Sequence, residues 1–159
     1  MDEMSASEMD SDQFTDDALA LLAEANREAN RLRHEYIGTE HIVLALTERD
    51  VDVVTAAFER TGVDRRQVHQ SITGIVASGR DGQPSELERP FTSRTKASFA
   101  FAAESARTMR QPRIAPEHLL LGVLREGMNI GAQVLSEHGL TVETATQAIE
   151  QIRSAEGSS

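Results

Sequence analysis

The chain of 159 residues contains no cysteine and no tryptophan, and Tyr36 is its single tyrosine. Without cysteine it can form neither a disulfide framework nor a thiolate metal site, and it has no thiol nucleophile. No apolar run approaches the roughly 20 residues that a membrane-spanning helix needs. The first residues show neither the basic nor the apolar part of a secretory signal. We therefore expect a cytoplasmic protein with an aliphatic core.

Positive charge is also scarce, because 26 acidic residues stand against 16 basic ones and give a net charge of −10. This balance argues against nucleic acid and anionic membranes as partners. Five acids precede Phe14, and no Lys or Arg stands among them. Residues 1–13 show no apolar periodicity, so we predict that they form a disordered acidic tail.

One stretch occurs twice and organises the rest of the chain. The letters YIGTEH at residues 36–41 precede an apolar run, and RIAPEH at residues 113–118 precedes another. The two histidines are 77 positions apart (118 − 41), and the Phe-Thr pair at residues 14–15 returns at the same distance at residues 91–92. About 15 of roughly 63 aligned positions are identical without a gap, which indicates a duplicated unit.

Each copy has the pattern of four helices. Apolar residues recur at spacings of four and three after Thr15 and again after Thr92, as on one face of an α-helix. Asp50 or Asp52 can cap a third helix, Asp64 a fourth, and Gly62 and Gly139 stand at matching ends. No segment alternates with period two, so we predict an all-α fold of eight helices in two pseudo-twofold-related repeats. The expected parts are a tail at 1–13, repeat 1 at 14–77, a linker at 78–90, repeat 2 at 91–153 and a frayed end at 154–159.

These residues resemble the Clp repeat, the N-terminal domain of the Clp unfoldases, especially of the ClpC and ClpA type. The resemblance lies in Phe-Thr at residues 14–15, in HEYIGTEH at residues 34–41, in Arg-Glu-Gly at residues 125–127 and in Val-Leu at residues 134–135. It extends over nearly everything from residue 14 to residue 153. It implies the pseudo-twofold helical fold predicted above.

The resemblance also implies a non-enzymatic module that binds peptides and adaptor proteins, and that recruits clients to an ATP-driven unfoldase. No G-x-x-x-x-G-K-[ST] stretch is present to cradle the phosphates of ATP. The chain is then an excised N-domain or a stand-alone relative, and its acidic start fits the latter slightly better. A stand-alone relative could be a regulator that sequesters tagged proteins or small ligands from the unfoldase.

In ClpC-type members the resemblance further implies recognition of phosphoarginine, by the Thr that opens helix one and the Glu of the Thr-Glu-His segment. The matching residues are Thr15 with Glu40, and Thr92 with Glu117. The chemistry is reasonable, because a helix N-terminus attracts phosphate and a carboxylate pairs with a guanidinium. The alternative is that both threonines are plain N-caps and both glutamates merely favour a first turn.

The two candidate phosphoarginine sites differ in charge near the threonine. Thr92 is followed at two positions by Arg94, as is usual in the family, whereas Thr15 is followed by two aspartates. An arginine attracts a phosphate and two carboxylates repel it. We therefore predict that Thr92, Arg94 and Glu117 form the stronger site, and that the Thr15 and Glu40 site is weak.

The Glu-His pairs at residues 40–41 and 117–118 raise a second class of function, a metal-dependent hydrolase. Neither pair belongs to an H-E-x-x-H motif, and no carboxylate-histidine cluster has ligand spacing. No G-x-S-x-G nucleophile motif is present either. We therefore expect structural histidines, no metal, no cofactor and no catalytic residue.

Overall fold

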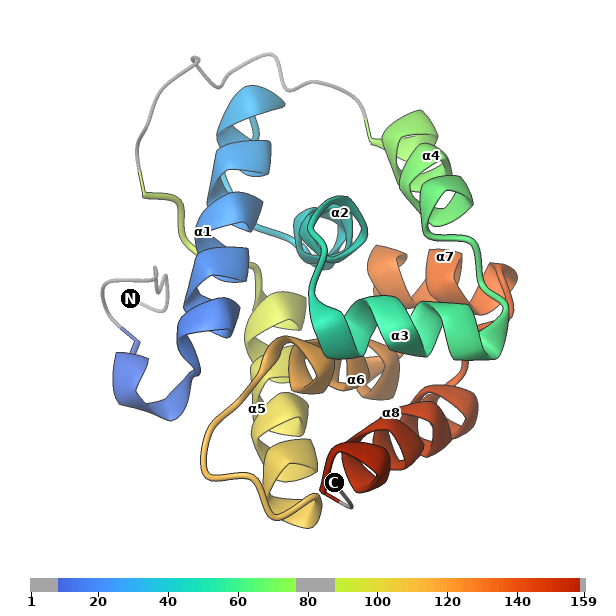
Figure 1. The fold of residues 1–159 in the computed structure, drawn as a ribbon. Helices are drawn as coiled ribbons and strands as arrows, with labels where there is room; N and C mark the ends of the chain where they lie inside the picture. The colour runs from blue at the N-terminus through green and yellow to red at the C-terminus, as the bar shows by residue number, and fades with distance from the viewer. Residues whose placement is uncertain (1–8, 77–87, 158–159) are drawn as a thin grey trace.

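The computed structural model describes residues 9–76 and 88–157, and within these ranges it is helical, with no β-strand (Figure 1). The predicted all-α class with eight α-helices is thus confirmed. A 3-10 helix, η2, spans Ser11–Gln13. The α-helices are α1 (Asp16–Arg31), α2 (Thr39–Glu48), α3 (Asp52–Thr61), α4 (Arg65–Ile75), α5 (Ser93–Thr108), α6 (Pro116–Glu126), α7 (Ile130–Glu137) and α8 (Val142–Gly157). None of them is both long enough and apolar enough to cross a membrane.

Most helix ends carry the caps that the sequence predicts. The Thr15 and Thr92 hydroxyls accept hydrogen bonds from the third residue of α1 and of α5, at 3.1 and 3.2 Å. Asp64 caps α4, and Gly62 ends α3 in the left-handed conformation at φ +74°. The expected cap of α3 by an aspartate is wrong. The N-cap position belongs to a valine between Asp50 and Asp52, and its N–H is satisfied by Thr55 Oγ1 at 3.2 Å.

Helices α2 and α6 form the centre of the molecule. Figure 1 shows α2 end-on, with α1, α3 and α4 around it. In α6 every residue from Pro116 to Leu124 is buried. Gly122 allows α6 to approach α5 closely, because an added Cβ would overlap the carbonyl oxygen of Ser98. This central pair fixes the first turns of α2 and α6, which carry Glu40 and Glu117.

The two repeats share one core. Within each repeat the first two helices pack together, α1 on α2 and α5 on α6. The later helices pack across the repeats, α3 on α8 and α4 on α7. The backbone follows the same symmetry, since Arg33 and Arg110, which are 77 residues apart (110 − 33), both have left-handed φ angles of 61° and 59°. Each repeat therefore supplies helices that pack against the other repeat.

Two short backbone contacts cross the repeats at the helix starts. Phe14 pairs with Ile114 and Ile37 pairs with Phe91, each as an isolated parallel bridge. The first turn of α1 consequently lies beside the segment before α6. The first turn of α5 lies beside the segment before α2. These contacts between the repeats determine which candidate threonine lies near which candidate glutamate.

The predicted boundaries need three adjustments where the chain is described. In the expected tail, residues 11–13 form η2, the Gln13 carbonyl accepts from Ile114 N–H at 2.7 Å, and Met9 packs against the core. At the end of the expected linker, Arg89 donates to Asn26 and Asn30. The expected frayed end is helical through residue 157. Expectations for residues 1–8, 77–87 and 158–159 lie outside the described residues.

Candidate functional site

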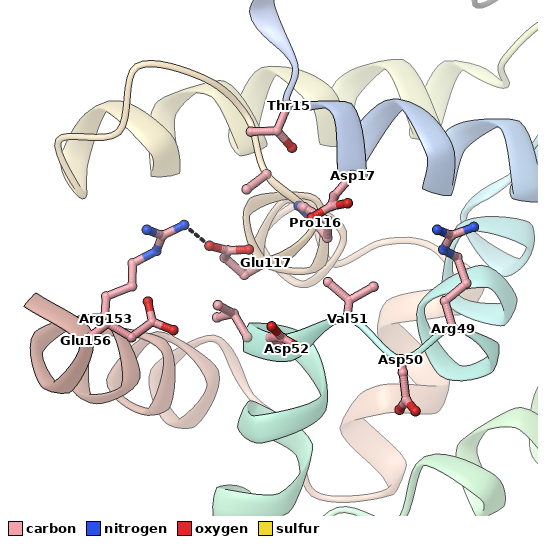
Figure 2. A pocket seen from close by; sticks show the side chains of 12 residues that line it. Thr15, Asp17, Arg49, Asp50, Val51, Asp52, Pro116, Glu117, Arg153 and Glu156 are labelled. Carbon is pink, nitrogen blue, oxygen red and sulfur yellow. Dashed lines mark hydrogen bonds and ion pairs between the residues drawn. The ribbon is translucent and has the colours of Figure 1, made fainter.

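A cavity of about 510 Å³ lies at the start of α1, between the two repeats (Figure 2). Thr15 reaches it from the N-cap position of α1 and Asp17 from its first turn, as Figure 2 shows. Glu117 reaches it from α6 and Arg153 from α8. The connection from α2 to α3 forms the opposite wall. We refer to this space as the Glu117 cavity, and its lining residues are Thr15, Asp17, Arg49, Asp50, Val51, Asp52, Val53, Ala115, Pro116, Glu117, Arg153 and Glu156.

Glu117 is buried on this cavity and already has a partner. Its residue is 2% exposed, and its carboxylate forms an ion pair with the Arg153 guanidinium (Figure 2). Glu117, which we predicted to belong to the stronger phosphoarginine site, is therefore already ion-paired within the chain. A buried carboxylate is costly without a compensating charge, and Arg153 supplies that charge from α8.

The start of α5 lies next to Glu40. Thr92 N–H donates to the carbonyl oxygen of Ile37 at 3.0 Å, and Thr95 Oγ1 donates to the same oxygen at 3.1 Å. Gly38 follows directly, and the Glu40 carboxylate folds back over it, where a Cβ on Gly38 would collide with it. Among the described residues Glu40 has no ion pair. We call Thr92, Arg94, Gly38 and Glu40 the Glu40 site.

The predicted pairing of threonines and glutamates is wrong. The sequence analysis paired them within each repeat, whereas the structure exchanges them between repeats. Thr15 shares a cavity with Glu117, and Thr92 lies beside the segment that carries Glu40. The physical reason is the pair of bridges at the helix starts, which join residue 14 to residue 114 and residue 37 to residue 91.

The charges at matching positions of the two repeats are reversed between the Glu117 cavity and the Glu40 site. Asp17 and Arg49 line the Glu117 cavity. At the matching positions, 77 residues later, stand Arg94 and Glu126, which form an ion pair of 2.8 Å. Burial acts to raise the pKa of Glu126, but hydrogen bonds from Arg94 and Asn129 outweigh it, so that the pKa is lowered. Position 76, which matches Arg153, is valine, so the counter-ion of Glu117 has no equivalent at Glu40.

Sequence reasoning missed Arg153 and Glu126. Arg153 is 36 positions from its partner Glu117 in the chain and belongs to a different helix. An alignment of the two repeats could have drawn attention to it, because Arg153 of the second repeat matches a valine, Val76, in the first. Glu126 was noticed only as part of the Arg-Glu-Gly turn, and its contact with Arg94 depends on the packing of α5 against α6.

The two histidines of the repeated stretch hold the starts of α2 and α6. His41 Nδ1 accepts from Gly38 N–H at 2.9 Å, and His118 Nδ1 accepts from Ala115 N–H at 2.9 Å. This geometry matches the second half of a capping box. Burial, together with the nearby His34, lowers the pKa of His41 to about 3, and burial lowers that of His118 to about 4. Both rings are therefore neutral at pH 7.

The same geometry bears on the metal hypothesis. The sequence analysis found no carboxylate-histidine cluster at ligand spacing, and the structure corrects this, because His34, Glu40 and His41 each place one possible ligand atom within 4.8 Å of the others. However, His41 Nδ1 accepts a hydrogen bond, so the neutral ring carries its proton on Nε2, which lies 2.8 Å from His34 Nδ1. A protonated Nε2 has no lone pair for a metal. Metal binding here would require the cap of α2 to break.

The sequence of this chain matches the family described as the Clp repeat (R) N-terminal domain, over residues 13–138 and again over residues 90–156. It is 32% identical over 139 residues to "Negative regulator of genetic competence ClpC/MecB" of Bacillus subtilis, which covers 87% of this chain and 17% of that protein. It is 33% identical over 142 residues to "Chaperone protein ClpC2, chloroplastic" of Oryza sativa, covering 89% of this chain and 15% of that one.

Solved structures show the same fold. The N-terminal domain of ClpD from Arabidopsis thaliana has a TM-score of 0.67 at 24% identity, over 92% of this chain and 97% of that one. A ClpV N-domain, solved in complex with a VipB peptide, has a TM-score of 0.70 at 16% identity, over 88% of each chain. The fold and the repeated stretch thus define a Clp N-domain. This chain belongs to the Clp repeat N-terminal domain family, and it spans less than a fifth of the length of the curated relatives it matches.

Proposed function

We propose that this chain recruits adaptor proteins or phosphoarginine-tagged clients for a Clp unfoldase in the cytoplasm, and that the Glu40 site holds the phosphorylated arginine side chain. The observation that carries the proposal is the position of the Glu40 carboxylate, which lies beside the start of α5 and has no ion pair among the described residues. Family membership supports a protein-binding role of this kind. A peptide bound to a related N-domain, that of ClpV, supports it as well.

The Glu40 site offers complementary groups for both halves of the ligand. The first turn of α5 can present backbone N–H groups and the positive end of a helix dipole to the phosphate. The N–H groups of Thr92 and Thr95 are already bonded, to Ile37 and to the Thr92 hydroxyl, which leaves those of Ser93 and Arg94 for a ligand. Arg94 stands in that turn, and its side chain is 56% exposed. The Glu40 carboxylate can accept hydrogen bonds from the guanidinium. Thr92 and Arg94 belong to the predicted stronger site as well, whereas Glu40 takes the place predicted for Glu117.

The Glu117 cavity is a poor phosphoarginine site by the same reasoning. Arg153 already pairs with its carboxylate, and Asp17 stands where the Glu40 site has Arg94. Three further carboxylates, those of Asp50, Asp52 and Glu156, line the cavity. They would repel a phosphate. Phosphoarginine binding with a stoichiometry of one is therefore expected.

Calorimetric titration with free phosphoarginine tests the proposal. Glu40→Gln removes the charge that holds the guanidinium and should abolish measurable binding. Glu117→Gln is the matched control in the other repeat, and it should leave the affinity unchanged. Equal losses in both variants, or no binding by the wild-type protein at millimolar ligand, would exclude the Glu40 site. The protein would then be better described as an adaptor-docking surface.

A further inference from the structure

Two exposed apolar side chains lie in the connection from α6 to α7. Met128 is 73% exposed, more than any other large apolar side chain in the part of the chain that the structure describes. Ile130, the first residue of α7, is 39% exposed. Neither belongs to the described apolar residues that pack against the core. We call these two side chains the apolar shelf, and ask what covers it.

The apolar shelf is held in place at both ends. At the end of α6, Glu126 pairs with Arg94 at 2.8 Å and also accepts a hydrogen bond of 3.0 Å from Met128 N–H. At the start of α7, Gly131 N–H donates to Thr39 Oγ1 at 3.2 Å. An added Cβ on Gly131 would lie 3.1 Å from the Thr39 carbonyl oxygen. The shelf therefore lies between the start of α5 and the first turn of α2, which are the two parts of the Glu40 site.

The internal repeat places the apolar shelf on a wall of the Glu40 site by a second route. Positions 51 and 53, which match 128 and 130 at the spacing of 77, are valines that line the Glu117 cavity. Both valines are half-buried and pack against the core. In the Glu40 site the same wall carries longer side chains that are more exposed. These are available to a ligand that occupies the site.

We infer that the apolar shelf binds a large apolar side chain next to the phosphoarginine of a client, so that the Glu40 site prefers phosphoarginine in an apolar sequence. The inference rests on the proposed function and adds to it a preference for the neighbouring residues. A phosphoarginine in a protein is part of a chain that advances by about 3.3–3.6 Å per residue when extended. The residue on either side of it can therefore reach the shelf while the phosphoarginine lies beside Glu40.

A peptide fits the apolar shelf better than the other occupants of exposed apolar surface. A stable interface between two copies of a chain buries about 1,200–2,000 Å², and two side chains supply only a small part of that area. The net charge of −10 disfavours an anionic membrane. Methionine is suited to peptides of varied sequence, because its unbranched thioether adapts to apolar partners of different shape.

Two blocked peptides test the inference by calorimetry. Both carry a central phosphoarginine, which has leucine on each side in one peptide and serine on each side in the other. The wild-type protein should bind the leucine peptide roughly tenfold more tightly, because a leucine side chain is partly removed from water on the shelf. Met128→Ser combined with Ile130→Ser should abolish this preference. The affinity of the double variant for the serine peptide and for free phosphoarginine should stay unchanged.

A control variant and a spectroscopic measurement accompany the titrations. Met109→Ser changes the same type of residue at the other end of α5, where it is half-buried, and should keep the full preference for leucine. The methyl resonance of Met128 in the wild-type protein should shift with the leucine peptide and much less with the serine peptide. This second measurement needs no substitution, so it does not depend on how the double variant folds.

The outcomes separate the inference from the proposed function. Equal affinity of the wild-type protein for the two peptides, or a leucine preference that survives in the double variant, overturns the inference and leaves phosphoarginine binding intact. Dimerisation of the wild-type protein that the double variant abolishes assigns the shelf to a second copy and also overturns it. Failure of the wild-type protein to bind free phosphoarginine and both peptides overturns the proposed function, and the inference with it.

Discussion

The Thr92 backbone N–H donates a hydrogen bond of 3.0 Å to the carbonyl oxygen of Ile37. Through this bond the start of α5, in the second repeat, lies against the segment that leads into α2, in the first. The matching bond joins Thr15 N–H to the carbonyl oxygen of Ile114 at 2.9 Å. Each candidate site is therefore built from both repeats, and neither repeat holds a complete site.

Arg94 and Glu126 provide a test of the phosphate half of the Glu40 site. Arg94→Ala should weaken phosphoarginine binding by about 10- to 100-fold, the range expected for losing a charge-assisted hydrogen bond of ~1.5–3 kcal/mol. Glu126→Gln should instead tighten binding a few-fold, because it frees Arg94 from a 2.8 Å ion pair. Calorimetry measures both effects. Asp17→Ala, at the position matching Arg94, is the control, and a comparable change there would contradict the assignment.

The predictable part of the fold rests on local signals. Thr15, Thr92, Asp64 and Gly62 cap or end helices within three residues of their own positions, so spacing alone identifies them. The exception is α3, where the connection from α2 allows a valine to be the N-cap despite the aspartates on either side. There the course of the backbone, and not the capping preference of aspartate, determines which residue is the N-cap.

The candidate sites depended on contacts that no local pattern shows. The sequence analysis paired Thr15 with Glu40 because both lie in one repeat, whereas the structure places Thr15 beside Glu117. The exchange follows from Phe14 meeting Ile114, a contact between residues far apart in the chain. The ion pair of Glu117 depends on one long side chain, that of Arg153 in α8. Neither contact leaves a periodic signal.

Gly122 should be required for the close packing of α5 against α6. Gly122→Ala places a Cβ against the carbonyl oxygen of Ser98, which is backbone and cannot move away alone. Overpacking of this kind costs about 1–3 kcal/mol in the free energy of unfolding. Urea denaturation measures it.

Gly74→Ala is the matched control for this substitution. Gly74 lies in α4, and among the described residues an added Cβ there meets no atom within 4 Å beyond its chain neighbours and its own helix backbone. The free energy of unfolding should rise by ~0.5–1 kcal/mol, because alanine is the better helix former. Equal losses in Gly122→Ala and Gly74→Ala would contradict the packing described for α6.

The buried histidines should make stability fall on mild acidification. The pKa of His41 is lowered to about 3 and that of His118 to about 4, whereas both titrate near 6.5 in the unfolded chain. The unfolded state therefore binds more protons below pH 6.5. Stability is complete above pH 6.5 and is lost as the pH falls toward 4, by up to ~1.4 kcal/mol per pH unit for each histidine.

A double substitution, His41→Gln with His118→Gln, isolates this effect. Glutamine can accept the same N-cap hydrogen bond but does not titrate. Between pH 6.5 and 4.5 the free energy of unfolding of the variant should depend on pH less steeply than that of the wild-type protein. Identical slopes would show that neither histidine is responsible.

Zinc should leave the starts of α2 and α6 unchanged at pH 7. His41 Nδ1 accepts from Gly38 N–H, so the ring presents a protonated Nε2 to His34. Equimolar Zn²⁺ should therefore neither shift the ring resonances of His41 nor raise the melting temperature. A specific shift of these resonances, lost in His34→Ala, would favour the metal-dependent alternative.

An NMR titration of the wild-type protein with phosphoarginine tests the central claim most directly, because it locates the ligand without any substitution. The account predicts that the backbone amides of residues 92–95 and 38–41 shift together, saturating at one ligand per chain, while those of residues 15–18 and 115–118 stay in place. Shifts concentrated at residues 15–18 and 115–118, or at residues 92–95 together with 115–118, would contradict it.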